Sequence, residues 1–289
     1  MSGVIKHPNL EDLMHGTVTI VNSYGKINIQ GTGFLYTIFE NPEINGCHNL
    51  VGIWLVTCKH IVIPHDADRK SYLADKIEFK IRKVLDDDSV EWLGMSICDD
   101  ELKSRLKIHP DPNVDVVVID VFDRVMNLID KAASKSLNIL RFDGINNMHL
   151  PMYSKIQMHG GDDVVVIGFP KGFYDDTNKY PVLKSGMIAS RWGLHFKGNP
   201  MFLLDSKLLE GSSGSPVVSK PSQFAMENGR LLWNETPQYV FLGVYSGNYA
   251  PSDVTDDDEY EQYCFGSVWY SDLVPWIIDH GITLSNDND

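Results

Sequence analysis

The chain lacks two features that mark proteins of the membrane and of the secretory route. Nowhere do about 18 uncharged apolar residues run together, as a membrane-spanning helix would require. The first residues, MSGVIKHPNLEDLMHG, have no basic start followed by an apolar core, so they do not resemble a secretory leader. We therefore expect a cytoplasmic protein.

Basic residues are scarce relative to acidic ones. The 289 residues include 25 Lys and Arg against 39 Asp and Glu, which gives a formal net charge of -14. Such a chain repels polyanions at long range, so we expect neither nucleic acid nor an anionic membrane as a partner. Three acidic runs, at 86–88, 99–101 and 256–259, are interpreted as solvated loops, because none has the alternating oxygen ligands and turn glycine of a calcium loop.

Cysteine is also sparse, and no repeat is visible. The four cysteines, Cys47, Cys58, Cys98 and Cys264, form no CxxC pair, so we interpret them as free, buried thiols rather than disulfides or zinc ligands. No metal and no cofactor is expected. The lack of a self-similar period argues against a solenoid or a propeller.

What the sequence does contain is a succession of short apolar runs separated by polar turns, such as TVTIVNSYG, KIEFKIRKVL and DDVVVIGFP. This rhythm is typical of antiparallel strands. It is interrupted by helical spacing at Val125, Leu128, Ile129 and Ala132, and it ends in SDLVPWIIDHG, a helix that Ser271 can cap and Gly281 can end. The predicted organisation is an N-terminal segment (1–15), an all-β unit (16–122), a connector (123–150), a second all-β unit (151–271), and a C-terminal helix with its tail (272–289).

The segment Gly211-Ser212-Ser213-Gly214-Ser215-Pro216 carries the first chemical signal. A serine that attacks an acyl group needs its hydroxyl exposed on a tight turn whose backbone N–H groups face the substrate carbonyl, and flanking glycines allow that geometry. Ser213 is the serine that these glycines bracket. Taken alone, the hexapeptide also fits an ordinary hairpin turn, because turns favour the same residues.

Two more signals precede it in the chain. His60 follows the apolar run Ile53–Thr57, where a rigidly held general base could lie. Asp115 begins the very apolar run VDVVVID, where a carboxylate is costly unless it is hydrogen-bonded, as it would be when orienting an imidazole. Asp111 and Asp120 are alternative acids.

In this order, His60, Asp115 and Ser213 resemble the catalytic triad of trypsin-like serine peptidases, especially the bacterial branch with Deg/HtrA-type protease domains. The matching pieces are GTGFLY (31–36), LVTCKHIV (55–62), VDVVVIDV (114–121), VVVIGFPKGF (164–173), LKSGMIAS (183–190), GSSGSPVV (211–218), LGVYSG (242–247) and FGSVWYSDLVPWI (265–277). The resemblance implies two six-stranded antiparallel β-barrels of the chymotrypsin type with a C-terminal helix. It also implies a serine endopeptidase that acts on protein or peptide substrates.

The same resemblance assigns roles to the residues. His60 takes the proton of Ser213, Asp115 steadies His60, and the backbone N–H groups of Gly211 and Ser213 form the oxyanion hole. Ser212 stands where secreted relatives have an aspartate that pairs with a new N-terminus, so activation by N-terminal trimming is not expected. The wall of the substrate pocket is expected to include Lys207, Leu208, Leu209, Glu210, Tyr245, Ser246, Gly247 and Phe265.

Two other functions remain open at the level of sequence. The chain could be a pseudopeptidase that binds a peptide by β-augmentation in the cleft between the barrels. It could also be an effector that stays inactive until an activating protein partner orders its loops.

Overall fold

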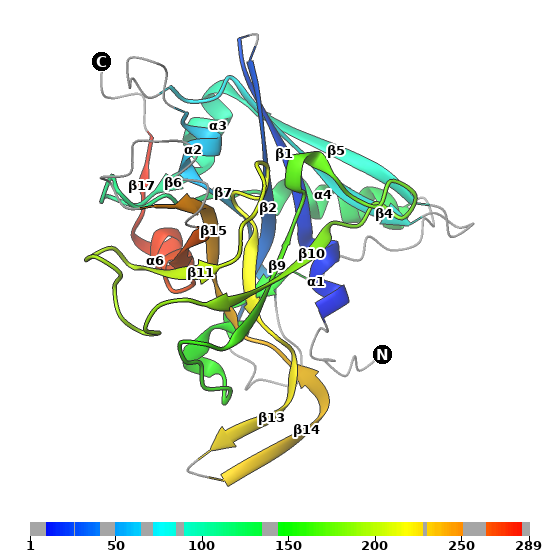
Figure 1. Ribbon diagram of the computed structural model, residues 1–289. Helices are drawn as coiled ribbons and strands as arrows, with labels where there is room; N and C mark the ends of the chain where they lie inside the picture. The colour runs from blue at the N-terminus through cyan, green and yellow to red at the C-terminus, as the bar shows by residue number, and fades with distance from the viewer. Residues whose placement is uncertain are drawn as a thin grey trace.

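Figure 1 shows the chain as a computed structural model, which describes residues 10–25, 27–40, 50–64, 72–84, 90–134, 144–227, 230–250 and 264–284. The helices are α1 (Leu10–Gly16), α2 (Lys59–Val62), α3 (Asp99–Arg105), α4 (Phe122–Ser134) and α6 (Leu273–His280), with 3-10 turns η1 (Asn147–His149), η2 (Pro151–Tyr153) and η3 (Pro170–Gly172). The first strands are β1 (Thr17–Tyr24), β2 (Ile27–Phe39), β3 (Leu50–Thr57), β4 (Lys76–Val84), β5 (Val90–Cys98), β6 (Leu106–Ile108), β7 (Val117–Asp120) and β8 (Ile145–Asn146). The later strands are β9 (Asp163–Gly168), β10 (Val182–Ile188), β11 (Met201–Asp205), β12 (Pro216–Ser219), β13 (Ser222–Glu227), β14 (Arg230–Gln238), β15 (Phe241–Tyr249), β16 (Phe265–Tyr270) and β17 (Ile282–Thr283).

The N-terminal strands form an open sheet. Its order is β17-β6-β7-β3-β2-β1-β4-β5, with β8 paired in parallel to β2. Buried apolar residues and more exposed polar residues alternate along β4. Ile77, Phe79 and Ile81 are buried, and polar residues lie between them. The predicted β-structure of this half is confirmed, but the second closed six-stranded barrel is not, because the edge strands β5 and β17 do not pair in the described part of the chain.

Helix α3 accounts for the open edge. The chain leaves β5 directly into the sequence DDELKSR, which has acidic residues at its start and basic residues in its last turn, as a helix dipole favours. The helix contacts β4, β5, β7 and β17, and it buries Leu102 completely. A helix therefore fills the gap that a closing strand pair would occupy.

The C-terminal half forms the closed barrel that the sequence predicts. Its strands follow one another in the order β10-β11-β16-β15-β12-β9, and all neighbouring pairs are antiparallel. Val164, Phe202, Val217 and Val268 fill its interior. One predicted barrel of the two is thus present.

Several barrel strands bury both of their faces. In β9, Val166 belongs to the barrel interior, whereas Ile167 belongs to the core shared with the N-terminal sheet. The same division separates Val217 from Val218 in β12. Successive strand residues point to opposite faces, so a strand covered on both sides is a continuous apolar run. This explains runs such as VVVIGF, and it joins the two halves through one core.

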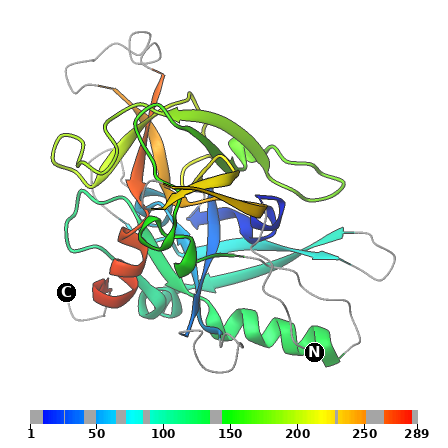
Figure 2. The same ribbon diagram turned by 90° about the horizontal axis from the view of Figure 1, so that it is seen from below.

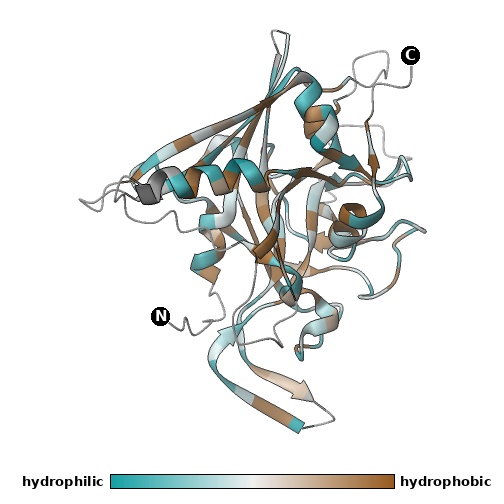
Figure 3. Ribbon diagram, turned by 180° about the vertical axis from the view of Figure 1, so that it is seen from behind, coloured by the Kyte–Doolittle hydropathy of each residue, from teal (hydrophilic) through white to brown (hydrophobic). Residues whose placement is uncertain are grey.

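The helices lie on the N-terminal sheet, as Figure 2 shows. Helix α4 contains the predicted helical spacing, buries Val125 and contacts β3, and Figure 3 shows polar and apolar residues alternating along it. Helix α6 contacts β6 and β7 and ends at Gly281, as predicted. The predicted cap is wrong: Asp272, not Ser271, is the N-cap residue. Helix α1 was not predicted.

An inserted hairpin projects from the barrel at the bottom of Figure 1. Strands β12 and β15 are antiparallel neighbours, so a tight turn could join them, but the chain instead forms β13 and β14 between them. The hairpin places Ala225 toward the body and leaves Phe224, Met226, Leu231 and Trp233 exposed. Met226 N donates a hydrogen bond to Lys155 O at 3.3 Å, which anchors β13 to the segment after η2.

The other sequence expectations have mixed outcomes. Cys58 is buried as predicted, but Cys98 is half-buried and Cys264 is exposed, while Cys47 lies outside the described residues. The acidic run at 99–101 begins helix α3 rather than a loop, and the runs at 86–88 and 256–259 lie outside the described residues. Within the described ranges, no helix combines the length and apolar character needed to cross a membrane.

We expect Leu102→Ala to lower the free energy of unfolding by about 2–5 kcal/mol, because it opens a cavity under α3. Leu194→Ala, at an exposed loop position, should change it by less than about 0.5 kcal/mol. Chemical denaturation of both variants measures the difference. Equal effects would show that α3 does not contribute to the core of the open sheet.

Candidate active site

His60 is positioned by the end of β3. The strand passes into the single turn of α2, in which Ile61 and Val62 are buried and His60 stays partly exposed. Asn22 of β1 donates a side-chain hydrogen bond to the carbonyl of Ile61. His60 therefore lies on a turn that a hydrogen bond from β1 holds against the sheet.

Asp115 reaches His60 because β7 pairs with β3. Thr57 lies opposite Val117, so the residues just beyond these positions meet at the same end of the two strands. One oxygen of Asp115, Oδ2, lies 2.7 Å from His60 Nδ1, and the other, Oδ1, accepts the His60 backbone N–H at 2.9 Å. His60 Nδ1 carries the proton that faces the carboxylate, which leaves Nε2 as the basic nitrogen.

The two alternative acids have other partners. Asp111 Oδ1 accepts the backbone N–H of Asn113 at 2.9 Å. Asp120 Oδ1 accepts the backbone N–H of Phe122 at 3.0 Å, where it begins α4. Of the three candidates, Asp115 is the one that the structure places against His60.

Ser246 of β15 adds a third hydrogen bond to Asp115, because its Oγ donates to Oδ2 at 2.5 Å. Burial tends to raise the pKa of Asp115. The hydrogen bonds from His60, the charge of His60 and the hydrogen bond from the Ser246 hydroxyl together outweigh burial, so the pKa of Asp115 lies below its ordinary value. The carboxylate is therefore held ionised at neutral pH.

Ser213 lies on a turn that requires glycine on both sides. Gly211 has a φ of 84° and Gly214 a φ of 87°, in the left-handed region. A Cβ on Gly214 would lie 2.0 Å from Thr32 O, and one on Gly211 would lie 2.8 Å from Phe169 O. The glycines of GSSG are therefore required by close backbone approach as well as by φ.

The Ser213 hydroxyl donates to the backbone carbonyl of Ser246 at 3.0 Å. Within the described residues it forms no hydrogen bond with His60. The nucleophile candidate is thus linked to Asp115 through Ser246, whose carbonyl accepts the Ser213 hydroxyl and whose own hydroxyl binds Asp115.

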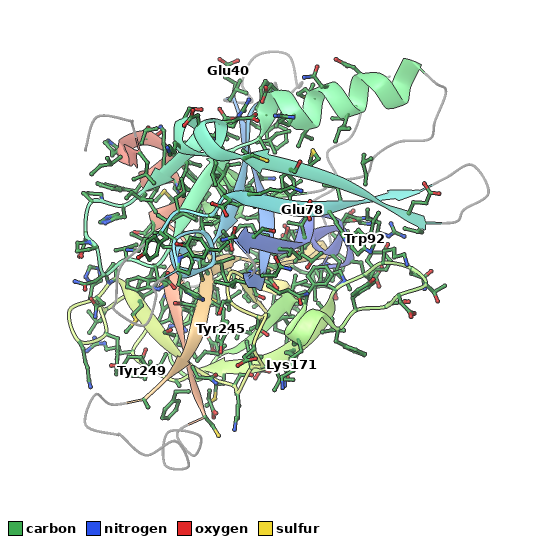
Figure 4. The ribbon with its side chains drawn as sticks, turned by 90° about the horizontal axis from the view of Figure 1, so that it is seen from above. Glu40, Glu78, Trp92, Lys171, Tyr245 and Tyr249 are labelled. Carbon is green, nitrogen blue, oxygen red and sulfur yellow. The ribbon has the colours of Figure 1, made fainter. Side chains whose placement is uncertain are left out.

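The predicted oxyanion-hole donors are available. Among the described residues, neither the N–H of Gly211 nor that of Ser213 donates a hydrogen bond. The carbonyl of Glu210 accepts the N–H of Lys171 at 2.5 Å, and Figure 4 labels Lys171 on the loop after β9. Because a trans peptide directs its C=O and N–H in opposite directions, this bond turns the Gly211 N–H away from Lys171.

The predicted substrate-pocket residues lie in different environments. Leu208 and Tyr245 belong to the buried barrel core, and Figure 4 shows Tyr245 midway along β15 and Tyr249 near its end. Ser246 is bound to Asp115, and the exposed or half-buried residues are Lys207, Leu209, Glu210, Gly247 and Phe265. A groove of about 780 Å³ between η1, η2 and β14, and another of about 430 Å³ beside β13, are lined by none of these residues.

Cys58 packs under the pair of His60 and Asp115. Its Sγ lies 3.2 Å from the carbonyl of Tyr245, and burial, followed by the charge of Asp115, raises the pKa of the thiol well above its ordinary value. The three residues place possible metal-ligand atoms within 4.8 Å of one another. A metal would need the thiolate, which the raised pKa opposes, and His60 Nδ1 is already bonded to Asp115, so the arrangement fits proton transfer better than a metal centre.

Residues 31–224 match the family model of the trypsin-like peptidase domain. The chain belongs to the trypsin-like peptidases. The match includes His60, Asp115 and Ser213, and it confirms the family resemblance inferred from the sequence motifs. Among curated protein sequences, none matches this chain.

The chain is similar to several solved proteases, and for one of them the TM-score exceeds 0.5. The tobacco etch virus protease complexed with product has a TM-score of 0.51 and 8% identity, over 98% of this chain and 86% of that one. An HtrA-type protease with a tripeptide has a TM-score of 0.46 and 13% identity, over 93% of this chain, which spans only 61% of its length. The protease Anisep from Arthrobacter nicotinovorans has a TM-score of 0.46 and 11% identity, over 90% and 91%. At these identities the likeness concerns the fold alone.

Sequence reasoning missed two residues of this trypsin-like peptidase site. Thr32 lies inside the motif GTGFLY, where its hydroxyl gives no local sign that it binds the Gly211 carbonyl. Ser246 was assigned to the substrate pocket, and the local sequence YSGN gives no sign that its hydroxyl binds Asp115. Both contacts join segments more than 100 residues apart, so only the folded chain reveals them.

We expect the acid stability of the protein to depend on Asp115. Because its folded-state pKa is lowered, the stabilisation from its ionised form is present above the unfolded value of about 3.9 and is lost as pH falls through the folded pKa. The difference in unfolding free energy between wild type and Asp115→Asn should therefore shrink between pH 5 and pH 2. Denaturant titrations across this range measure it, and a constant difference would contradict the assignment.

We expect Gly214→Ala to lower the unfolding free energy by at least about 2 kcal/mol, since it combines a strained φ with a clash against Thr32 O. The matched control is Gly193→Ala, which has a φ of 78° but open space around the new Cβ. It should cost about 1 kcal/mol from backbone strain alone. Thermal and chemical unfolding of both variants separate the two effects, and equal losses would contradict the close approach.

Proposed function

We propose that the protein is a serine endopeptidase that cleaves peptide bonds through an acyl-enzyme intermediate. The carrying observation is the His60–Asp115 pair, joined at 2.7 Å and linked through Ser246 to Ser213. Ser213 lies on a turn whose two candidate oxyanion donors have no acceptor in the described residues. Membership of the trypsin-like peptidase family supports this assignment.

The first chemical step requires a rotation of the Ser213 side chain. Its hydroxyl leaves the Ser246 carbonyl and turns to His60 Nε2, which accepts the proton as Oγ bonds to the substrate carbonyl carbon. The carbonyl π electrons move to oxygen, where the N–H groups of Gly211 and Ser213 receive the negative charge. The rotation also frees the Ser246 carbonyl to accept a substrate N–H.

His60 then passes its proton to the leaving amine, and the C–N bond breaks to leave an ester on Ser213. Water attacks this ester with His60 again as the base, and proton return to Ser213 Oγ releases the acid product. Asp115 stabilises the protonated imidazole throughout, and its lowered pKa keeps it ionised while it does so.

Substrate selection involves the exposed end of the predicted pocket. Lys207, Leu209 and Glu210 lie on the segment before Gly211, where they can contact a peptide approaching Ser213. Lys207 stands where trypsin has a pocket-floor aspartate, so we propose that cleavage does not favour Lys or Arg before the scissile bond. Protein or peptide chains are the proposed substrates.

One observation favours a second candidate, an effector that an activating protein partner switches on. The Ser213 hydroxyl is bonded to Ser246 O rather than to His60, so the resting arrangement differs from the one that the reaction needs. In this candidate the partner or peptide stabilises the rotated serine. A pseudopeptidase would bind peptide without completing the rotation.

Fluorophosphonate labelling of purified protein tests the function, with the adduct located by mass spectrometry. We expect labelling at Ser213 in wild type, no adduct at position 213 in Ser213→Ala, and at least about a 100-fold slower reaction in His60→Ala, because the general base is lost. Ser246→Ala is the comparison that keeps both reacting groups but removes a partner of Asp115. No labelling of folded wild type, with or without peptide, would reject a constitutive peptidase and leave the partner-activated effector and the peptide-binding pseudopeptidase.

A further inference from the structure

Thr32, at the middle of β2, forms an unusual set of contacts with the Ser213 turn. Its side chain is completely buried. Its Oγ1 donates to the carbonyl of Gly211 at 2.7 Å and accepts the backbone N–H of Phe169 at 3.1 Å. Its own N–H donates to the carbonyl of Ser213 at 2.9 Å.

These hydrogen bonds have only one possible direction. A carbonyl can only accept a hydrogen bond and a backbone N–H can only donate one. The Thr32 hydroxyl must therefore donate to the Gly211 carbonyl and accept from the Phe169 N–H. In turn, the carbonyl of Thr32 accepts the hydroxyl of Thr57 at 2.8 Å. Thr32 is therefore locked in one orientation by partners on β3 and on two segments of the barrel.

The contacts fix the peptide planes on both sides of the Ser213 N–H. The Gly211 carbonyl belongs to the peptide that precedes Ser212, and the Ser213 carbonyl belongs to the peptide that precedes Gly214. Because peptide groups are planar, holding both carbonyls restricts the rotation of the peptide between them, which carries the Ser213 N–H.

The same hydroxyl acts on the other donor through Phe169. Holding the N–H of Phe169 places the start of η3, where the N–H of Lys171 binds the carbonyl of Glu210 at 2.5 Å. That carbonyl shares a peptide plane with the Gly211 N–H. The Thr32 side chain therefore acts on the Gly211 donor through both the Gly211 carbonyl and the loop after β9. The Ser213 donor is held by the Thr32 backbone N–H at the Ser213 carbonyl and by the Ser215 N–H, which binds the Ser212 carbonyl at 3.0 Å, so the Thr32 hydroxyl reaches it only through the Gly211–Ser212 peptide.

We propose that Thr32 is a positioning residue that aims the N–H groups of Gly211 and Ser213 at the developing oxyanion. The proposal rests on the peptidase function proposed above. Thr32 touches no reacting atom; it acts by holding the turn against the sheet, so the oxyanion hole forms only where the two halves of the chain are docked.

Other contacts keep the loop after β9 in place when the hydroxyl is removed. The rings of Trp92 and Tyr174 lie 5.6 Å apart, and Arg82 lies 4.1 Å from the ring centre of Tyr180. Loss of the Thr32 hydroxyl is therefore expected to change the orientation of the turn rather than to detach the loop.

The test compares Thr32→Val, Thr32→Ser and Thr37→Val. Valine keeps the shape of threonine but places a methyl group against the Gly211 carbonyl, whereas serine keeps the hydroxyl. Thr37 is the matched control, because it is a buried threonine on the same strand whose hydroxyl binds Ile145 O, away from the turn. Thr32→Ala, which introduces no clash, replaces valine if the valine variant does not fold.

The main readout is the reaction with a fluorophosphonate, separated into initial affinity and the rate constant of bond formation. We expect Thr32→Val to lower the rate constant of bond formation by about 10- to 100-fold, which is no more than the effect of losing one oxyanion donor. The initial affinity for the fluorophosphonate should change by less than about threefold. Thr32→Ser and Thr37→Val should react within about threefold of wild type. Wild-type reactivity of Thr32→Val, or equal losses in Thr32→Ser or Thr37→Val, would overturn the proposal.

A second readout does not depend on activity. Hydrogen exchange followed by mass spectrometry over 205–216 and 165–175 should accelerate in Thr32→Val and Thr32→Ala but not in Thr32→Ser or Thr37→Val. If wild type fails to react, the peptidase function fails, and exchange still decides whether Thr32 holds the turn. Unchanged exchange in the valine and alanine variants would overturn the positioning role by itself.

Discussion

The core shared by the open sheet and the barrel is the constraint on which the rest of the structure depends. Strands β9, β12, β15 and β16 send alternate side chains into the barrel and into the N-terminal sheet, so neither half buries its apolar surface alone. The rings of Phe34 and Phe241, at 5.4 Å, lie in this shared layer. Because the layer fixes how the halves meet, it also fixes the relative positions of groups that each half contributes to the site.

The candidate site is assembled at this junction from separate pieces. The N-terminal sheet supplies His60 and Asp115 through the pairing of β3 with β7, and the barrel supplies Ser213 on a turn between β11 and β12. Ser246 then joins the pieces, since its hydroxyl binds Asp115 and its carbonyl accepts the Ser213 hydroxyl. One residue thus contacts both Asp115 and Ser213.

Departures from a pair of closed barrels occur away from this junction. Helix α3 contacts both edge strands of the open sheet, β5 and β17, and the salt bridges Arg105–Asp123 and Arg124–Glu101 tie it to α4. The inserted hairpin of β13 and β14 extends from the other half. The β3–β7 pairing and the GSSG turn are both present beside these additions, although the first half does not close.

The strand rhythm, the helical spacing of α4, the helix α6 and the barrel of the second half could be predicted from the sequence, which also indicated His60, Asp115 and Ser213 as candidates for a triad. These follow from local patterns: alternation, helical spacing, and polar residues at the ends of apolar strands. Three features could be seen only in the tertiary structure. They are the packing of α3 against the edge strand β5, the acceptor of the Ser213 hydroxyl, and the hydrogen-bond partners of Thr32 and Ser246. Those outcomes depend on contacts between segments far apart in the chain, such as the hydrogen bond from the Thr32 N–H to the Ser213 carbonyl, which no local pattern encodes.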